Sequence, residues 1–575
     1  MIARALSTIC ALLLALAGMG GDAHAQPAKP TLPVALFAGG EAPANALPTS
    51  VFTPPPGARP APMRITGKLT LAGEASDRFS LIADDFGSID AGEPVASLPP
   101  LEIDLVATGD EVIPARRGPI AGNHHYWEWI VEPGRTWEDP SRPGTSMVAL
   151  PFSLIERNAN CIHNGLLLIA IGTDGRASRA LYQIGSETCA YLQFDMWGIT
   201  DATFTPGEVA GSDRLILAYD REKAERRPVR PISDLGDVAT AGFGSPEEVS
   251  PAALTTFGYS TGGTLFAGPC PTRHGPYPYC DVLDLPSYSW AKSLVAGIAA
   301  MRLEFLFPGA MEAKISDYVP ECLAADWQGV TFRNALDMAS GHYNSDKYDE
   351  DEASQQMRAF FLAETHAEKI ALACTAFPRK DEPGRRFVYR TADTYILGTA
   401  MAAYLRSHVK GDVDLYDGLI VPIWKALGLS PAAMVTRRTL DSQGQPFTGW
   451  GLVLHRNDIA VLADFLQRGG TIGGQPILDR AMLDEALQRN KRRRGLRAVV
   501  ETQRYQHAFW AWNAASALGC AGEAWIPALS GYGGLSAALM PNGATYFYIS
   551  DGGQFAWAKA AAASNRLAPF CERLQ

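Results

Sequence analysis

The chain has 575 residues, of which 47% are hydrophobic and 19% are charged, and its formal net charge is -11 at pH 7. This length exceeds what one ordinary core can hold, so two or more domains are expected, and the composition excludes wholesale disorder. The acidic balance argues against nucleic acid as a partner, and the one basic run, at 489–494, is expected to be a solvated helix end or loop.

The first 25 residues are typical of a secretory signal. Arg4 precedes an apolar stretch at 9–17, and Ala23-His24-Ala25 stands before Gln26. The apolar stretch is too short to span a bilayer, and no other run approaches the ~20 residues that a span needs. The sequence therefore predicts a secreted or periplasmic protein, cleaved near Ala25 and without a membrane span.

Cleavage would remove Cys10 and leave eight of the nine cysteines. An even number in an exported chain favours disulfides, although eight cysteines permit about 105 pairings. Sequential pairing keeps each pair within one expected structural unit, and it predicts the bonds Cys161–Cys189, Cys270–Cys280, Cys322–Cys374 and Cys520–Cys571. No CxxC or HxxxH spacing occurs, so we expect neither a metal nor an organic cofactor.

After a Pro-rich segment at 26–62, residues 63–220 show the alternation and the Gly, Pro and Asp punctuation of short strands. The pattern predicts an all-β, sandwich-like N-terminal domain, for which contact with a cell-wall or other polymer is left open as a role. Its expected strands cover 64–71, 101–107, 126–131, 146–155, 165–171, 180–184, 191–196 and 214–219. Residues 221–250 are charged and rich in Pro and Gly, which predicts a linker.

Residues 251–575 mix helical and strand patterns, which predicts an α/β (α+β) domain with a central antiparallel sheet covered by helices. An edge strand is expected at 256–267. Expected helices cover 289–301, 332–339, 392–406 and 456–468. The end of the chain predicts a hairpin at 535–550, turned by Pro541-Asn542-Gly543, and then a helix at 555–568.

Ser289-Trp290-Ala291-Lys292 at the start of the first of these helices is the segment that points to chemistry. Residues i and i+3 share a helix face, so the amine can stand beside the hydroxyl. A neutral lysine can take the proton of a serine, and burial favours the neutral form. A second Ser-x-x-Lys, at 407–410, ends a helical run and meets Gly411, so it is expected to be a C-terminal stop.

The segments that follow Ser289 resemble, in order, those of the serine β-lactamase-related superfamily, over about residues 255–575. This group includes class C β-lactamases, D-alanyl-D-alanine carboxypeptidases, family VIII esterases and 6-aminohexanoate-dimer hydrolases. The matching segments are 287–293, 315–321, 335–341, 383–391 with 395–398, 451–470 and 531–534. Ordered matches of this number are far more specific than any one of them.

The resemblance implies a role for each matching residue. Ser289 would attack a carbonyl carbon and form an acyl-enzyme, with Lys292 and Tyr389 as the proton relay. Backbone N–H groups of Ser289 and of the third motif, Gly531-Tyr532-Gly533-Gly534, would hold the oxyanion, with the Gly533-Gly534 end as the expected contributor.

Two departures from the family pattern bear on the substrate. Thr391 stands where the second motif has asparagine, and Gly531 stands where the third motif has lysine or histidine. Losing a cation that would bind a substrate carboxylate favours an ester or amide without that group. Arg390 is the candidate for a substitute charge, although strand alternation is expected to turn it away from the face of Tyr389.

Three interpretations of the function remain. The first is an exported serine hydrolase acting on a small-molecule or peptide-like ester or amide. The second is a catalytically degraded binding or sensor protein of the cell envelope, and the third is a true β-lactamase or D-alanyl carboxypeptidase. The stretch Gly258–Gly262 has the spacing of a nucleophile elbow, but it lacks the preceding apolar strand and following helix that this motif needs.

Overall fold

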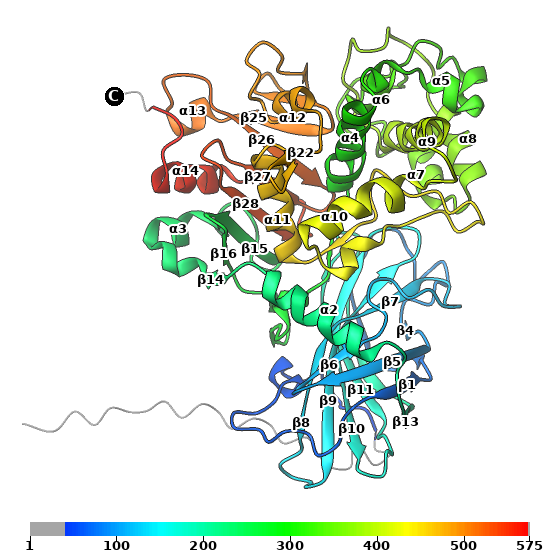
Figure 1. Ribbon diagram of the computed structural model, residues 1–575, viewed down its shortest axis with the longest axis vertical. Helices are drawn as coiled ribbons and strands as arrows, with labels where there is room; N and C mark the ends of the chain where they lie inside the picture. Colours follow the sequence, from blue (N-terminus) through cyan, green and yellow to red (C-terminus); the bar gives the residue numbers. More distant parts are fainter. Residues whose placement is uncertain (1–40, 573–575) are drawn as a thin grey trace, which may run out of the picture.

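The computed structural model describes residues 41–572, so the predicted signal sequence and the start of the Pro-rich segment lie outside the described residues. Two sheets organise these residues, an 11-stranded sheet built from the N-terminal part and a nine-stranded sheet built from the C-terminal part. Figure 1 shows the first sheet in blue and cyan on one side, with the second sheet and most helices on the other.

The N-terminal sheet is antiparallel and runs in the order β13-β1-β5-β6-β8-β9-β10-β11-β12-β3, with β7 beside β9. The strands are β1 Gly67–Leu71, β3 Phe79–Asp84, β5 Leu101–Thr108, β6 Glu111–Pro114, β7 Trp127–Val131, β8 Gly134–Glu138, β9 Thr145–Glu156, β10 Ile162–Gly172, β11 Ala180–Thr188, β12 Leu192–Thr200 and β13 Ala202–Pro206. A separate two-stranded sheet joins β2 Glu74–Ala75 to β4 Ser97–Leu98.

The expectation of two facing sheets in this part is wrong, because the strands hydrogen-bond into one sheet that curls around its own core. Leu69 on β1 and Met196 on β12 lie near opposite ends of the strand order, yet both belong to one buried cluster with Trp129. Strands β9 and β10, of 12 and 11 residues, are buried almost throughout, so both faces of the sheet are covered there. The curled sheet itself covers one of these faces.

The segment predicted to be a strand at 214–219 and then a linker at 221–250 is instead structured. Helix α2 covers Ser212–Glu225, where only Tyr219 is buried. Charged side chains spaced for a helix stabilise it, such as Glu222 and Arg226 at i and i+4. Strand β14, Val229–Pro231, then joins the C-terminal sheet, and α3, Asp237–Gly242, follows.

The C-terminal sheet has the order β14-β16-β15-β28-β27-β26-β25-β24-β23. Its other strands are β15 Leu254–Thr261, β16 Thr264–Ala267, β23 Leu496–Arg497, β24 Gln503–Gln506, β25 Phe509–Asn513, β26 Trp525–Gly531, β27 Leu535–Leu539 and β28 Thr545–Ser550. The predicted terminal hairpin is β27 and β28. The predicted edge strand is wrong, because β15 and β16 form a hairpin inside the sheet and β14 takes the edge.

Helices cover both faces of this sheet. One face packs in a cluster with α3 and α14 Ala558–Leu567, and the other packs with α4 Ile298–Leu306 and α11 Arg456–Gln467. The remaining helices are α5 Ile315–Tyr318, α6 Phe332–Leu336, α7 Gln355–Leu362, α8 His366–Thr375, α9 Thr391–His408, α10 Val421–Leu427, α12 Arg480–Ala486 and α13 Ala515–Leu518. Short paired strands are β17 Pro271–Thr272 with β18 Gly275–Pro276, β19 Leu285–Pro286 with β20 Val453–Leu454, and β21 Thr471–Ile472 with β22 Gln475–Pro476.

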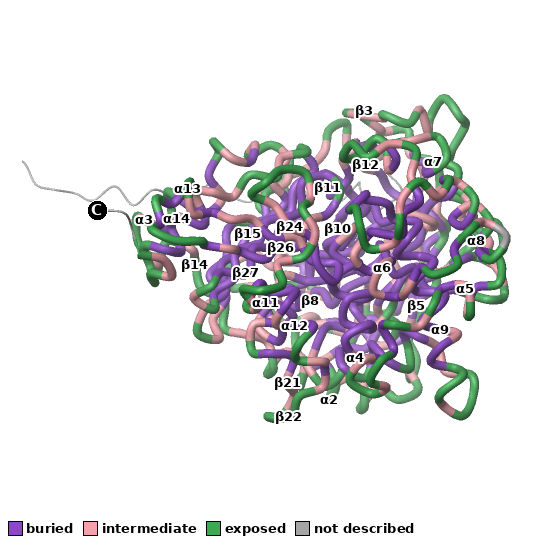
Figure 2. Tube along the Cα trace, turned by 90° about the horizontal axis from the view of Figure 1, so that it is seen from above, coloured by how far each residue is buried: buried purple, intermediate pink, exposed green. Residues whose placement is uncertain are grey.

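One hydrophobic core joins the two sheets. Met147 on β9 and Leu168 on β10 lie in the same cluster as Trp290 and Leu294 of the Ser289 segment and Leu529 of β26. Figure 2 shows the buried trace concentrated in the middle of the molecule, around β8, β10, β26 and β27. The outer face of β9 and β10 is therefore an internal surface, which explains their continuous burial.

Four disulfides lie within these elements: Cys161–Cys189, Cys270–Cys280, Cys322–Cys374 and Cys520–Cys571. They are the pairs that sequential pairing predicts. Within residues 41–572, no helix combines the length and the apolar composition that crossing a bilayer requires.

The shared core predicts that the two sheets unfold together. On heating, far-UV circular dichroism and tryptophan fluorescence should report one coincident transition, because separating the sheets would expose the cluster around Met147 and Trp290. Two resolved transitions in a calorimetric scan would contradict this expectation.

Candidate active site

Ser289 lies on a sharp turn that leads from β19 into the helical segment ending in α4. Tyr288, just before it, has a φ of +39°, a region that residues other than glycine rarely adopt and that costs about 1–3 kcal/mol. The Lys292 N–H donates to the carbonyl of Ser289 at 3.0 Å, which starts the helix one turn below the serine. The backbone N–H of Ser289 has no acceptor among the described residues and is available to a ligand.

Lys292 lies against the Ser289 hydroxyl, as the spacing predicted. Its Nζ is 2.7 Å from Ser289 Oγ and 3.3 Å from the carbonyl oxygen of Gly449. The lysine is only 2% exposed. Burial lowers its pKa to about 8, against a smaller opposing effect of the Glu352 carboxylate. Near pH 8 a large fraction of the amine is therefore neutral and carries a lone pair that can accept a proton.

Tyr389, to which the sequence resemblance gives a part in the proton relay, lies beside Lys292. Lys292 Nζ lies 5.0 Å from the centre of the Tyr389 ring. Burial raises the pKa of Tyr389 well above 10, the Glu352 charge adds to this, and a hydrogen bond with Ser289 opposes it. Near pH 8 the phenol is thus neutral, whereas the Lys292 amine is already partly deprotonated. Lys292 is therefore a better base than Tyr389 at this pH, and Tyr389 still carries a proton that it can donate.

Glu352 is a member of the cluster that the sequence analysis missed. Its carboxylate accepts the backbone N–H of Thr391 at 2.7 Å and also the Thr391 hydroxyl. Burial raises its pKa, and the Lys292 charge opposes that shift. In the sequence Glu352 is the last of four consecutive acidic residues, 349–352. Such a run normally indicates a solvated surface, so no sequence signal marks this carboxylate.

The second motif holds a cation that is already used within the protein. Arg390 is 1% exposed, and its Nη2 donates to Ser340 Oγ at 2.7 Å and to Asp393 Oδ1 at 2.5 Å. Its charge is thus neutralised by a carboxylate one helical turn along α9. Arg390 does not supply the substitute charge for a substrate carboxylate.

One glycine of the third motif, at residues 531–534, lies next to the turn that carries Ser289. Gly531 ends β26, and a Cβ there would lie 3.1 Å from the Ser287 carbonyl oxygen, so β26 runs close to the nucleophile turn at residues 287–289. Tyr532 is 51% exposed, and its ring lies 5.8 Å from that of Tyr288.

The two later glycines of this motif face another segment. Cβ atoms added at Gly533 and Gly534 would meet residues 550–554 and Ala190. Of the three glycines in the motif, Gly531 is thus the one that lies against the nucleophile turn.

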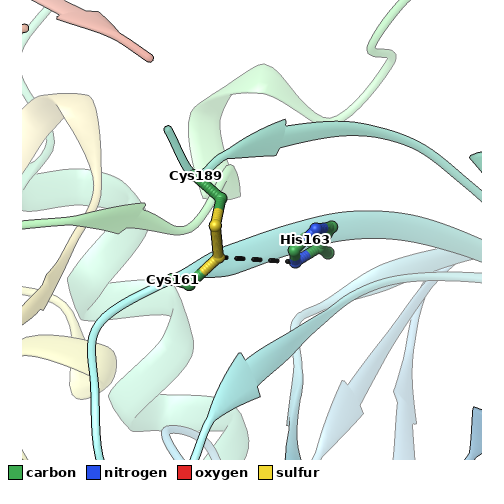
Figure 3. A group of neighbouring side chains, drawn as sticks. All are labelled: Cys161, His163 and Cys189. Carbon is green, nitrogen blue, oxygen red and sulfur yellow. Dashed lines mark hydrogen bonds between the residues drawn. A yellow bond between two sulfur atoms is a disulfide. The ribbon is translucent and has the colours of Figure 1, made fainter. Parts of the chain in front are cut away.

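Two groups of side chains among the described residues bring three potential metal ligands together. The first is Cys161, His163 and Cys189 (Figure 3), with His163 Nδ1 at 3.8 Å from Cys161 Sγ. The two sulfurs are bonded to each other, so neither is the thiolate that a metal requires. Burial lowers the pKa of His163 to about 3, and its neutral ring stacks on Phe194.

The second group is Glu132, Asp284 and His455. His455 Nε2 lies 3.4 Å from Asp284 Oδ1 and 3.7 Å from Glu132 Oε1, while Arg117 Nη2 pairs with Glu132 Oε2 at 2.6 Å. Burial acts to lower the pKa of His455, but the Glu132 and Asp284 carboxylates outweigh it and the pKa is raised, so the imidazole favours its charged form between the two carboxylates. The group fits a buried polar network that links the N-terminal sheet to the strand before Ser289.

Comparison with known proteins gives structural likeness without sequence matches. No protein-family model and no curated protein sequence matches the chain. Similar solved structures include a hydrolase with promiscuous acyltransferase activity (16% identity, TM-score 0.42, covering 60% of this chain and 99% of that one). Others are a family VIII carboxylesterase (18%, 0.40, 60% and 97%) and a class C β-lactamase (12%, 0.40, 60% and 97%). These proteins belong to the group that the sequence motifs resemble.

The Glu352 charge should tune the pH dependence of Ser289. Glu352→Gln removes a negative charge that raises the pKa of Lys292, so the amine should become neutral at lower pH. The acid limb of the rate of Ser289 labelling by a fluorophosphonate should then move below its wild-type midpoint near pH 8. Glu350→Gln, in the same loop but exposed, is the matched control and should leave the midpoint in place. A midpoint that moves upward in Glu352→Gln would contradict the assignment.

Proposed function

We propose that this chain is an exported serine hydrolase that cleaves an ester or amide bond through an acyl-enzyme on Ser289. The observation that carries the proposal is the buried contact of 2.7 Å between Lys292 Nζ and Ser289 Oγ, with the pKa of the lysine lowered to about 8. A buried, partly neutral amine beside a hydroxyl on a strained turn is the arrangement that activates a serine.

The first half of the reaction forms the acyl-enzyme. Neutral Lys292 takes the Ser289 proton as Oγ bonds to the carbonyl carbon. The neutral Tyr389 phenol then gives its proton to the leaving oxygen or nitrogen and regains one from the Lys292 ammonium, as the bond to the leaving group breaks. In the second half, water attacks the acyl carbon and gives a proton to the same relay. The bond between the acyl carbon and Ser289 Oγ then breaks, the relay returns the proton to Oγ, and the acid is released.

The developing oxyanion needs N–H donors near the nucleophile. The backbone N–H of Ser289 is one candidate, since it has no acceptor among residues 41–572. The close approach of Gly531, at the end of β26, to the Ser287 carbonyl supports a second donor from the turn 531–534.

The substrate class follows from the charges around Ser289. Arg390 is neutralised by Asp393, and Gly531 has no side chain, so neither offers a cation to a substrate carboxylate. Exposed Tyr532, whose ring lies 5.8 Å from that of the buried Tyr288, offers an aromatic surface instead. We therefore propose a small-molecule or peptide-like ester or amide without that carboxylate. The four disulfides support an oxidising, exported location.

Replacing Ser289 tests the proposal directly. Ser289→Ala should abolish both hydrolysis and labelling by a fluorophosphonate while leaving the melting temperature close to wild type, because the change removes one oxygen. Ser407→Ala is the matched control, since Ser407 belongs to the other Ser-x-x-Lys at the end of α9 and should be dispensable.

A panel of p-nitrophenyl esters, nitrocefin and D-alanyl peptides separates the remaining interpretations. Ester turnover without nitrocefin turnover is expected. A wild-type protein that no fluorophosphonate modifies would point to the degraded binding protein, and persistent acylation by a penicillin would point to the sensor.

Tyr389→Phe should slow turnover by about 10²–10⁴-fold, as removal of a proton-transfer group typically does. The loss should be larger for an alkyl ester than for a p-nitrophenyl ester, because p-nitrophenolate leaves without being protonated. Tyr505→Phe is the matched control: its buried hydroxyl has no hydrogen-bond partner among the described residues and its ring packs in the same aromatic cluster. Equal losses for both ester classes would argue against Tyr389 as the proton donor.

A further inference from the structure

We propose that Asn160, which belongs to the N-terminal sheet, is a positioning residue that holds the Ser289 nucleophile in register with Lys292. The inference rests on the proposed function of Ser289. Asn160 lies in the turn between β9 and β10 and is 1% exposed. It is 128 residues before Tyr288 in the sequence, yet its side chain forms a hydrogen bond with the backbone of the nucleophile turn.

The Asn160 amide joins the two chain segments that form the site. Its Oδ1 accepts the backbone N–H of Tyr288 at 2.8 Å and that of Gly451 at 3.0 Å, as well as the hydroxyl of Ser287 at 3.2 Å. Its Nδ2 donates to the carbonyl of Leu452 at 3.1 Å. One buried side chain thus binds the segment before Ser289 and the segment at 451–452 at the same time.

The hydrogen bonds of Asn160 are made to the two segments that position the Ser289 hydroxyl and the Lys292 amine. Tyr288 has the φ of +39° that turns the chain so that Ser289 leads into the helix, and such a conformation persists only where the surroundings hold it. The 451–452 segment continues from Gly449, whose carbonyl accepts from Lys292 Nζ. Asn160 therefore sets the position of the nucleophile relative to the segment that orients its base.

The turn that carries Asn160 is itself firmly held. Glu156 N–H donates to the Cys161 carbonyl at 3.1 Å, and Cys161 is bonded to Cys189 at the end of β11. Asn158, in the same turn, points elsewhere: its Nδ2 donates to carbonyls at the C-terminal end of α7, the nearest being that of Ala363 at 2.9 Å. Asn158 thus contacts the same half of the molecule without touching the nucleophile turn, which makes it a matched control.

The first test compares Asn160→Ala with Asn158→Ala by the rate constant for fluorophosphonate labelling of Ser289 and by kcat and KM for an ester. Asn160→Ala should lose about 10²-fold or more in labelling and in kcat, with KM changed by only a few-fold, because a misplaced nucleophile weakens the chemical step rather than binding. Asn158→Ala should label within about two-fold of wild type, since it removes a helix cap distant from the reacting atoms. An Asn160→Ala protein with wild-type circular dichroism and wild-type labelling would overturn the proposal.

The second test uses Asn160→Asp and covers the case in which the alanine variant fails to fold. A protonated aspartate has the shape of asparagine and can donate to the Leu452 carbonyl, whereas an ionised one would face that carbonyl with negative charge. Burial raises the pKa of such a carboxyl, so the labelling rate of Asn160→Asp divided by that of wild type should be close to one at low pH and fall as pH rises. A ratio that does not change with pH would overturn the positioning role.

The two proposals fail in different ways. If Ser289 is not the nucleophile, wild-type protein itself escapes the probe or Ser289→Ala remains active, whatever the Asn160 variants do. If only the Asn160 inference is wrong, wild type is labelled, Ser289→Ala is inactive, and the Asn160 variants behave like wild type.

Discussion

The burial of one lysine ammonium beside one serine hydroxyl is the constraint on which the rest of this structure depends. In water a lysine has a pKa of about 10.5, so near neutral pH it is protonated and cannot act as a base. Lys292 is 2% exposed, and the loss of hydration lowers its pKa to about 8. The fold must keep water away from Nζ and still give it polar contacts, which the Ser289 hydroxyl and the Gly449 carbonyl provide.

The charges near this lysine explain why it remains a usable base. The Glu352 carboxylate raises the lysine pKa and so limits the effect of burial, and it is held in place by Thr391 at the start of α9. Arg390, one residue earlier, would have the opposite effect if it faced the site. Its pairing with Asp393 inside the helical layer removes that influence. The same pairing leaves Arg390 without a free charge for a substrate carboxylate, which is the observation behind the proposed substrate class.

The N-terminal sheet is part of this arrangement and not an appended module. Its strands β9 and β10 are covered on one face by their own curled sheet and on the other by the core that contains Trp290. The turn between them carries Asn160 into the nucleophile turn. A binding role for the exposed parts of this sheet is compatible with that, but the sheet already has a structural task at the site.

Local spacing was enough to predict the features whose partners are near in sequence. The contact between Ser289 and Lys292 follows from one helical turn, and the terminal hairpin follows from a turn of three residues. Tyr389 was predicted only from the order of the family's motifs, because no rule of local spacing connects it with Ser289. Helix α2 was misjudged because its apolar residues occur in a short run, while the charge pairs that stabilise the helix lie at its end.

What the sequence by itself determined is the chemistry available: a hydroxyl and an amine one turn apart, four pairs of cysteines, and a segment order typical of a known group of hydrolases. Only the tertiary structure decided which other groups act on that pair. Glu352 stands in an acidic run and Asn160 in a turn between strands, and neither pattern differs from that of a surface loop. Their roles come from burial and from contacts across more than a hundred residues or between separate loops, and such contacts depend on how the layers pack and not on the spacing of residues along the chain.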